Sequence, residues 1–146
     1  MLIAQISDTH ILPPGSEEQT ARTRAENLRQ CIADINTQNV DFVLHTGDSV
    51  QNGAPEEYAY LREILSGLNA PFYMVPGNRD RGAALRGAMD HLSYLPREGE
   101  LLCYVVEDYP LRLIGLDTTI AGERKGFFCD ARADWLDRTL ADAPDK

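Results

Sequence analysis

Hydrophobic residues in the first part of the chain follow two alternating patterns, short continuous runs and helical spacing. Short apolar runs, each followed by a polar loop, predict buried strands at 2–6, 41–46 and 71–75. Apolar positions three and four residues apart predict helices at about 20–37, from Pro55 onward and at about 81–89.

The second part of the chain continues with a hairpin and a helix. Apolar residues around a central Tyr-Pro pair predict strands at about 102–107 and 111–116, and Asp130 is expected to cap a last helix. The order β-α-β-α-β-α-β-β-α predicts a single α/β domain over 1–146 with a largely parallel sheet. A helix in such a fold normally returns the chain to the sheet, and no strand follows this one. The fold is therefore expected to be incomplete at its C-terminal end.

Composition narrows the class of protein. The chain is 43% hydrophobic and 25% charged, which is ordinary for a globular protein, and it has no apolar run long enough to cross a membrane. Its N-terminus lacks the basic region of a signal peptide, which predicts a cytoplasmic protein. The net charge of −9 disfavours a nucleic acid polymer as partner. The three cysteines show no metal-binding spacing, and we expect Cys31, Cys103 and Cys129 to be buried free thiols.

Polar side chains follow each of the three predicted parallel strands. Asp8 and His10 come after the first strand, Asp48 after the second and Asn78 after the third. The carboxyl ends of parallel strands open on the same side of a sheet. These side chains are therefore expected to converge, although about 30 to 40 residues separate them along the chain.

The chemistry of this set favours metal binding. Imidazole and oxygen ligands together suit Fe, Mn, Zn or Co. Asp8 and His10 can reach one cation from a single loop, Asp48 can bridge two cations, and Asn78 offers an amide oxygen. Two cations about 3.5–4 Å apart can clamp a phosphoryl oxygen and generate hydroxide at neutral pH. Each residue alone has a simpler interpretation as a turn or cap residue, but their joint occurrence predicts a site for two metal ions.

The three motifs D-x-H, G-D and G-N-x-D, taken in this order, resemble the calcineurin-like metallophosphoesterase superfamily. They are formed here by Asp8 and His10, by Gly47 and Asp48, and by Gly77, Asn78 and Asp80. Other stretches are similar to its class III branch, which acts on cyclic nucleotides and glycerophosphodiesters: 6–10, 75–78, 116–118, 129–131 and 135–136. The resemblance implies a four-layer α/β/β/α sandwich, a dinuclear metal site and hydrolysis of phosphoesters.

The resemblance also implies a role for the residue after Asn78. The family has histidine there, which assists the leaving group and contacts the phosphate, whereas this chain has Arg79. Arginine matches a phosphate bidentately but cannot release a proton near neutral pH. We therefore expect Asn78 and Arg79 to bind the phosphate, Asp80 to orient the guanidinium, and catalysis to favour good leaving groups. The alternative for Arg79 is a structural role at the first turn of a helix.

The histidines form a second departure from the family. The family completes its site with later histidines, in H-H-P-P and G-H-x-H stretches, but this chain has only His10, His45 and His91. His45 is expected to face the core or the edge of the site, and His91 to be solvated. Four ligand candidates leave two metals under-coordinated unless water or another chain contributes. We therefore expect a truncated N-terminal portion, whose exposed apolar edges predict a homo-oligomer or swapped assembly.

Two classes of function follow from these observations. The leading one is a metal-dependent phosphodiesterase for small phosphodiesters such as cyclic nucleotides or glycerophosphodiesters. The alternative is a non-catalytic or degenerate phosphate- or metal-binding module, which the absent histidines and Arg79 favour. The motifs are shared across the superfamily and also fit a protein phosphatase, whereas the acidic charge disfavours a nuclease for long nucleic acids.

Overall fold

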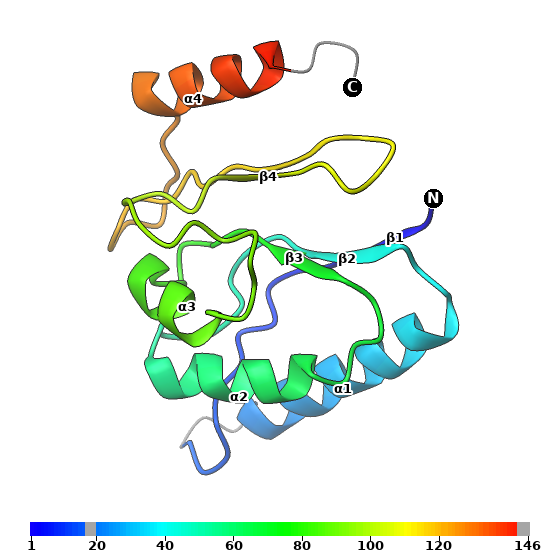
Figure 1. Ribbon diagram of the computed structural model, residues 1–146. Coiled ribbons are helices and arrows are strands. Elements are labelled where there is room, and N and C mark those ends of the chain that lie inside the picture. The colour runs from blue at the N-terminus through cyan, green and yellow to red at the C-terminus, as the bar shows by residue number, and fades with distance from the viewer. Residues whose placement is uncertain (17–19, 143–146) are drawn as a thin grey trace.

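A computed structural model describes residues 1–16 and 20–142. It contains a parallel sheet, a separate hairpin and helices on both outer sides (Figure 1). The elements in chain order are β1 (Ile3–Ile6), α1 (Ala21–Thr37), β2 (Phe42–His45), α2 (Pro55–Leu65), β3 (Phe72–Met74), α3 (Gly82–Ala88), β4 (Tyr104–Val106), β5 (Leu113–Gly115) and α4 (Asp130–Ala141).

The parallel sheet has the order β1-β2-β3, as the alternation of strands and helices predicted. In its register Ile6 lies opposite His45, and His45 lies opposite Met74. All three strands therefore end at the same edge of the sheet. The loops that carry the candidate ligands begin at this edge.

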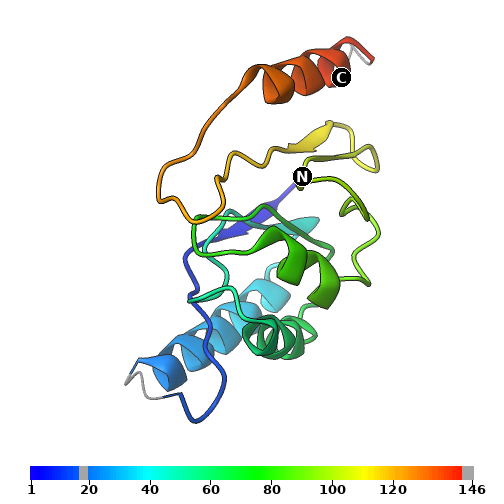
Figure 2. The same cartoon turned by 90° about the vertical axis from the view of Figure 1, so that its left-hand side faces the viewer.

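The last two strands do not join the parallel sheet. β4 and β5 pair with each other in an antiparallel sheet of their own, which confirms the hairpin that the sequence predicted. Figure 1 shows the resulting layers: α1 and α2, then the parallel sheet, then the hairpin, then α4. Figure 2 shows from the side that α4 lies on the far side of the hairpin from α1 and α2. This is the α/β/β/α arrangement that the resemblance implied.

One hydrophobic core joins the parallel sheet to its helices and to the hairpin. Phe42 of the central strand is fully buried, and the cluster that it belongs to includes residues of α1, α2 and β4. Tyr94 links the layers, because its ring contacts both Tyr73 of β3 and Tyr104 of β4. The core thus fixes the position of β3 and of the loop that follows it.

The last helix has weaker packing than its pattern suggested. Arg132 is its only buried residue, and Leu140 is half exposed. The helix begins at Asp130 with Cys129 as the N-cap residue and no side-chain cap, so the expectation that Asp130 caps it is wrong.

The three cysteines are free thiols, but the expectation that they are buried is wrong. Cys31 is exposed, because it lies outside the buried stripe of α1, and Cys103 and Cys129 are only partly buried.

Within the described residues, no helix is long and apolar enough to cross a membrane.

Candidate metal centre

The loops after β1 and β2 lie side by side beyond the ends of their strands. Backbone hydrogen bonds continue the pairing, from Asp8 N to Gly47 O and from His10 N to Asp48 O, both at 3.0 Å. Two loops that are 38 to 39 residues apart in sequence are thus aligned residue by residue. This alignment places the side chains of Asp8, His10 and Asp48 on one side of the sheet edge.

The backbone of these three residues is strained. Asp8, His10 and Asp48 have φ angles of 54°, 44° and 51°, in the left-handed region that side chains other than glycine avoid. Among the described non-glycine residues only Asn39 shares this property. Each such residue costs about 1–3 kcal/mol and persists only where its surroundings hold it, and such residues cluster at functional sites.

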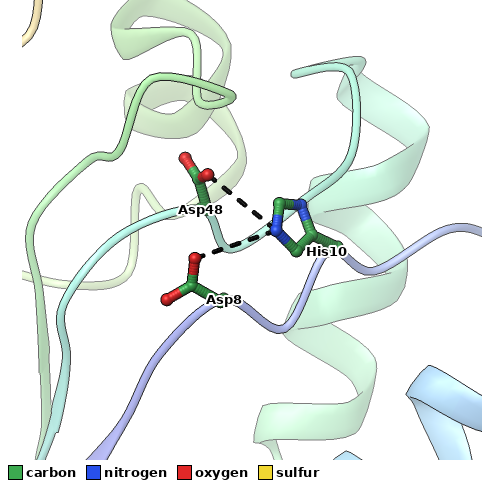
Figure 3. Close-up of side chains that lie close together, drawn as sticks. All are labelled: Asp8, His10 and Asp48. Carbon is green, nitrogen blue, oxygen red and sulfur yellow. Dashed lines mark ion pairs between the residues drawn. The ribbon is translucent and has the colours of Figure 1, made fainter. Parts of the chain in front are cut away.

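The three side chains converge on one point (Figure 3). The Nε2 atom of His10 lies 3.9 Å from Asp8 Oδ1 and 3.9 Å from Asp48 Oδ2, and the three ligand atoms all lie within 4.8 Å of one another. Two ligands about 2.1 Å from a shared cation can be at most about 4.2 Å apart. The two distances that involve His10 therefore fit a cation between these side chains.

The charges and hydrogen bonds of this group also bear on metal binding. Two carboxylates point at the same ring nitrogen, an arrangement that a cation stabilises. His10 Nδ1 is buried and has no hydrogen-bond partner among the described residues. A histidine that binds metal usually donates its second ring N–H to an acceptor, so Nδ1 lacks the partner that such a ligand commonly has.

The loop after β3 fixes Asp48 from the other side. Arg79 N donates to Asp48 Oδ1 at 2.9 Å, which leaves Oδ2 toward His10. Gly77 packs so closely that a Cβ atom there would lie 2.3 Å from Asp48 N and Oδ1. Asn78 lies between these two contacts in the same loop. Its place beside Asp48 agrees with the sequence, while its role as a ligand stays a prediction.

Asp80 has different partners from those expected. Its buried carboxylate accepts hydrogen bonds from Ser49 Oγ at 2.5 Å, Ser49 N at 3.2 Å, Gly77 N at 2.8 Å and Tyr58 OH at 3.1 Å. Among the described residues it forms no ion pair with Arg79, so the expectation that it orients this guanidinium is wrong. Asp80 instead holds the loop after β2 against the loop after β3.

Tyr58 of α2 completes this buried network. Its hydroxyl group donates to Asp80 and accepts a hydrogen bond from Arg81 N at 2.8 Å. Burial, and next the negative charge of Asp80, raise the pKa of Tyr58, so it stays a neutral donor. Sequence reasoning missed Tyr58 and Ser49, because only the fold brings them to Asp80.

His45 belongs to the core beneath the site. Gly47 N donates to its Nδ1 at 3.3 Å, so the ring proton is on Nε2, which lies 3.0 Å from Thr9 Oγ1. Burial lowers the pKa of His45 to about 4, which keeps the ring neutral. Both nitrogens are in use, and His45 therefore supports the Asp8 loop and is not free to bind a metal. His91 is exposed, as predicted.

The Tyr58 network leads to a prediction with a matched control. Tyr58→Phe should weaken Mn²⁺ binding by about tenfold, because Asp80 loses a hydrogen bond that helps to hold the loop of Asp48 in place, and a lost hydrogen bond costs about that factor. Tyr94→Phe removes another buried hydroxyl that accepts a backbone N–H, from Met74, but lies outside this network. Each variant should lose about 1 kcal/mol of stability. Calorimetric titration should show weaker metal binding for Tyr58→Phe alone, and equal Mn²⁺ affinities would contradict this role.

A parallel α/β sheet with an Asp-His-Asp group at its carboxyl end, followed by a Gly-Asn loop, has the layout of a metal-binding phosphoesterase. The chain belongs to the calcineurin-like phosphoesterase family, whose model matches residues 1–144. It is 36% identical over its whole length to a probable glycerophosphodiester phosphodiesterase GpdQ of Arcobacter nitrofigilis, covering 54% of that protein. It is 27% identical over 99% of its length to the 3',5'-cyclic adenosine monophosphate phosphodiesterase CpdA of Escherichia coli, covering 51% of it. The chain thus spans about half the length of these curated relatives.

Proposed function

We propose that this chain forms part of a metal-dependent phosphodiesterase site for small phosphodiesters. The observation that carries the proposal is the convergence of Asp8, His10 and Asp48 at the carboxyl edge of the parallel sheet. Metal ions bound there polarise a phosphoryl oxygen and lower the pKa of bound water. The names of the relatives support glycerophosphodiesters and cyclic nucleotides as substrate classes.

The residues divide between two metal ions as follows. Asp8 and His10 would hold one ion, Asp48 would contribute to both, and the amide oxygen of Asn78 would serve the second. His45 and His91 add no ligand, because the first is buried with both nitrogens in use and the second is exposed away from the group. Water or a further polypeptide segment has to complete the coordination.

The site serves a small substrate rather than a polymer. The chain carries a net charge of −9, which repels nucleic acid at long range, while metal ions reverse the sign locally. The cytoplasmic location and the homo-oligomeric or swapped assembly that the sequence predicted stay predictions.

The alternative function, a phosphate- or metal-binding module without catalysis, is favoured by one observation. Arg79 occupies the position of the family's histidine, and its guanidinium makes no hydrogen bond or ion pair within the described residues. Such a guanidinium is available to bind a phosphate oxygen. The two functions are separated by the hydrolysis of bis-p-nitrophenyl phosphate. An enzyme hydrolyses it with added metal and stops when EDTA is added, whereas a module binds the metal without turnover.

The role of Arg79 leads to a second prediction. Arg79→His should raise the turnover of a diester with an alkyl leaving group by about tenfold or more, because a positioned general acid typically contributes at least that factor. A p-nitrophenyl leaving group needs no proton, so its hydrolysis should change little.

The matched control is Arg97→His, which makes the same exchange at an exposed position outside the site. It should leave both rates unchanged. If Arg79→His changes the hydrolysis rates of the alkyl and the p-nitrophenyl diester equally, or changes neither rate, Arg79 does not replace a general acid.

A further inference from the structure

A cavity of about 670 Å³ opens beside the candidate metal centre. It reaches Asn78 at one end and runs between α3, residues 99–101 and the start of α4, and its wall includes Arg81, Arg86 and Arg132. Because Asn78 lines the cavity and is the proposed ligand of the second metal ion, a molecule whose phosphate is bound at the metals can extend into this space.

Arg132 gives the cavity wall a buried positive charge. The residue is only 7% exposed, and its guanidinium donates to the carbonyl oxygens of Asp117 and Thr119, both at 2.7 Å, and to Cys129 Sγ at 3.3 Å. No carboxylate of the described residues lies within ion-pair distance. A buried guanidinium without a carboxylate partner keeps its full charge, which an anion in the cavity stabilises.

Arg81 and Arg86 likewise have no carboxylate partner among the described residues, although Arg81 is exposed and Arg86 is only partly buried. Arg81 Nη1 donates to the carbonyl oxygens of Asn78 and Asp80, and Arg86 Nη2 donates to Gly99 O at 2.7 Å. The buried Nε of Arg86 has no partner among the described residues. Elsewhere on this acidic chain, arginines form ion pairs with carboxylates. These pairs are Arg22–Glu26, Arg29–Glu63, Arg62–Asp90 and Arg112–Glu107.

Three acidic residues also line the cavity, and among the described residues none of them forms an ion pair with its arginines. Asp117 accepts hydrogen bonds from Leu102 N at 3.0 Å and from the backbone and hydroxyl of Thr119. Asp80 is bonded to Ser49, Tyr58 and Gly77 as described above. Glu100 is exposed and forms no ion pair with the arginines of the cavity.

We propose that this arginine cavity binds a second anionic group of the substrate, separate from the phosphate that reacts. The substrate class is then a small phosphodiester whose alcohol portion carries a carboxylate or phosphate oxyanion. The proposal rests on the proposed function, because it places the reacting phosphate at the metal centre beside Asn78.

The experiment measures inorganic phosphate and acetate binding to the 146-residue chain in EDTA, where no metal can hold the anion. We expect one phosphate per chain, bound about tenfold more weakly by Arg86→Gln, since a charge-assisted hydrogen bond contributes about that factor. Arg97→Gln, the same exchange at an exposed position outside the cavity, should bind like the unchanged chain. Displacement of phosphate by acetate identifies a carboxylate as the preferred group, and resistance to acetate identifies a phosphate.

Three results would overturn the proposal. Phosphate binding that does not saturate, or that Arg86→Gln and Arg97→Gln weaken equally, indicates an adventitious ion only. Loss of binding in Arg79→Gln but not in Arg86→Gln places the anion at the position of the reacting phosphate. Circular dichroism of each variant establishes that it is folded, and Arg86→Lys, which keeps the charge, should retain part of the affinity. None of these outcomes depends on hydrolysis, so this proposal and the proposed function can fail separately.

Discussion

Replacing Asp48 with asparagine is expected to remove metal binding while leaving the fold intact. Asparagine has the same shape, still offers an oxygen to the N–H of Arg79, and tolerates the left-handed backbone, which has φ 51° here. It lacks the negative charge that a bridging ligand supplies to a cation. Because partners behind metal ligands already contribute about 10- to 100-fold in affinity, loss of the ligand charge itself should cost about 100-fold or more.

The measurement for Asp48→Asn is the bound metal per chain after loading with Mn²⁺ and dialysis. Asp134→Asn, the same exchange at an exposed position of α4, is the matched control and should retain the metal. Thermal unfolding of the metal-free proteins should give similar midpoints for both variants. Full metal retention by Asp48→Asn would show that this carboxylate is not a ligand.

Gly77→Ala is expected to have the largest effect on stability. The added Cβ would lie 2.3 Å from both the N and Oδ1 of Asp48, a distance that real Cβ atoms do not reach. The loops after β2 and β3 would have to separate, which should cost about 1–3 kcal/mol, as overpacking typically does, and disturb the metal centre. Gly47 in the loop after β2 also packs closely against this loop, since a Cβ atom at Gly47 would lie 2.9 Å from Gly77 Cα.

Gly87→Ala is the control for this substitution. Gly87 lies within α3, where an added Cβ would meet nothing within 4 Å, so alanine should stabilise the helix by up to about 1 kcal/mol. Urea unfolding of the two variants should therefore give shifts of opposite sign. Equal midpoints would contradict the tight packing of the two loops.

Much of the fold follows from the periodicity of the sequence. The apolar runs that precede Ser7, Thr46 and Pro76 form β1, β2 and β3, as predicted, because short continuous apolar runs are typical of buried strands. β2 and β3 are largely buried, whereas β1 is partly exposed. The pairing of β4 with β5 was predicted as a hairpin, but its separation from the parallel sheet could not be read from periodicity. Hydrophobic alternation shows that a segment is a strand, whereas the sheet that it joins is set by packing between distant segments.

The candidate site also combines features that the sequence predicted with features that only the fold determines. Spacing alone anticipated that Asp8, His10 and Asp48 would lie together, because strand ends of a parallel sheet share one edge. Asp80 was assigned the wrong partner, since its neighbour in sequence is Arg79 while its neighbours in space are Ser49 and Tyr58. Networks of buried polar groups depend on tertiary positions, which motif spacing does not contain.

The most direct test of the metal centre is a titration of the metal-free chain with Co²⁺, followed by absorption spectroscopy. Histidine and carboxylate ligands should give weak visible bands that saturate, with no intense near-ultraviolet band from thiolate ligands. Asp48→Asn should abolish these bands, and Asp134→Asn should leave them unchanged. No bands at saturation, or a strong thiolate band that points to the cysteines, would contradict a metal site formed by Asp8, His10 and Asp48.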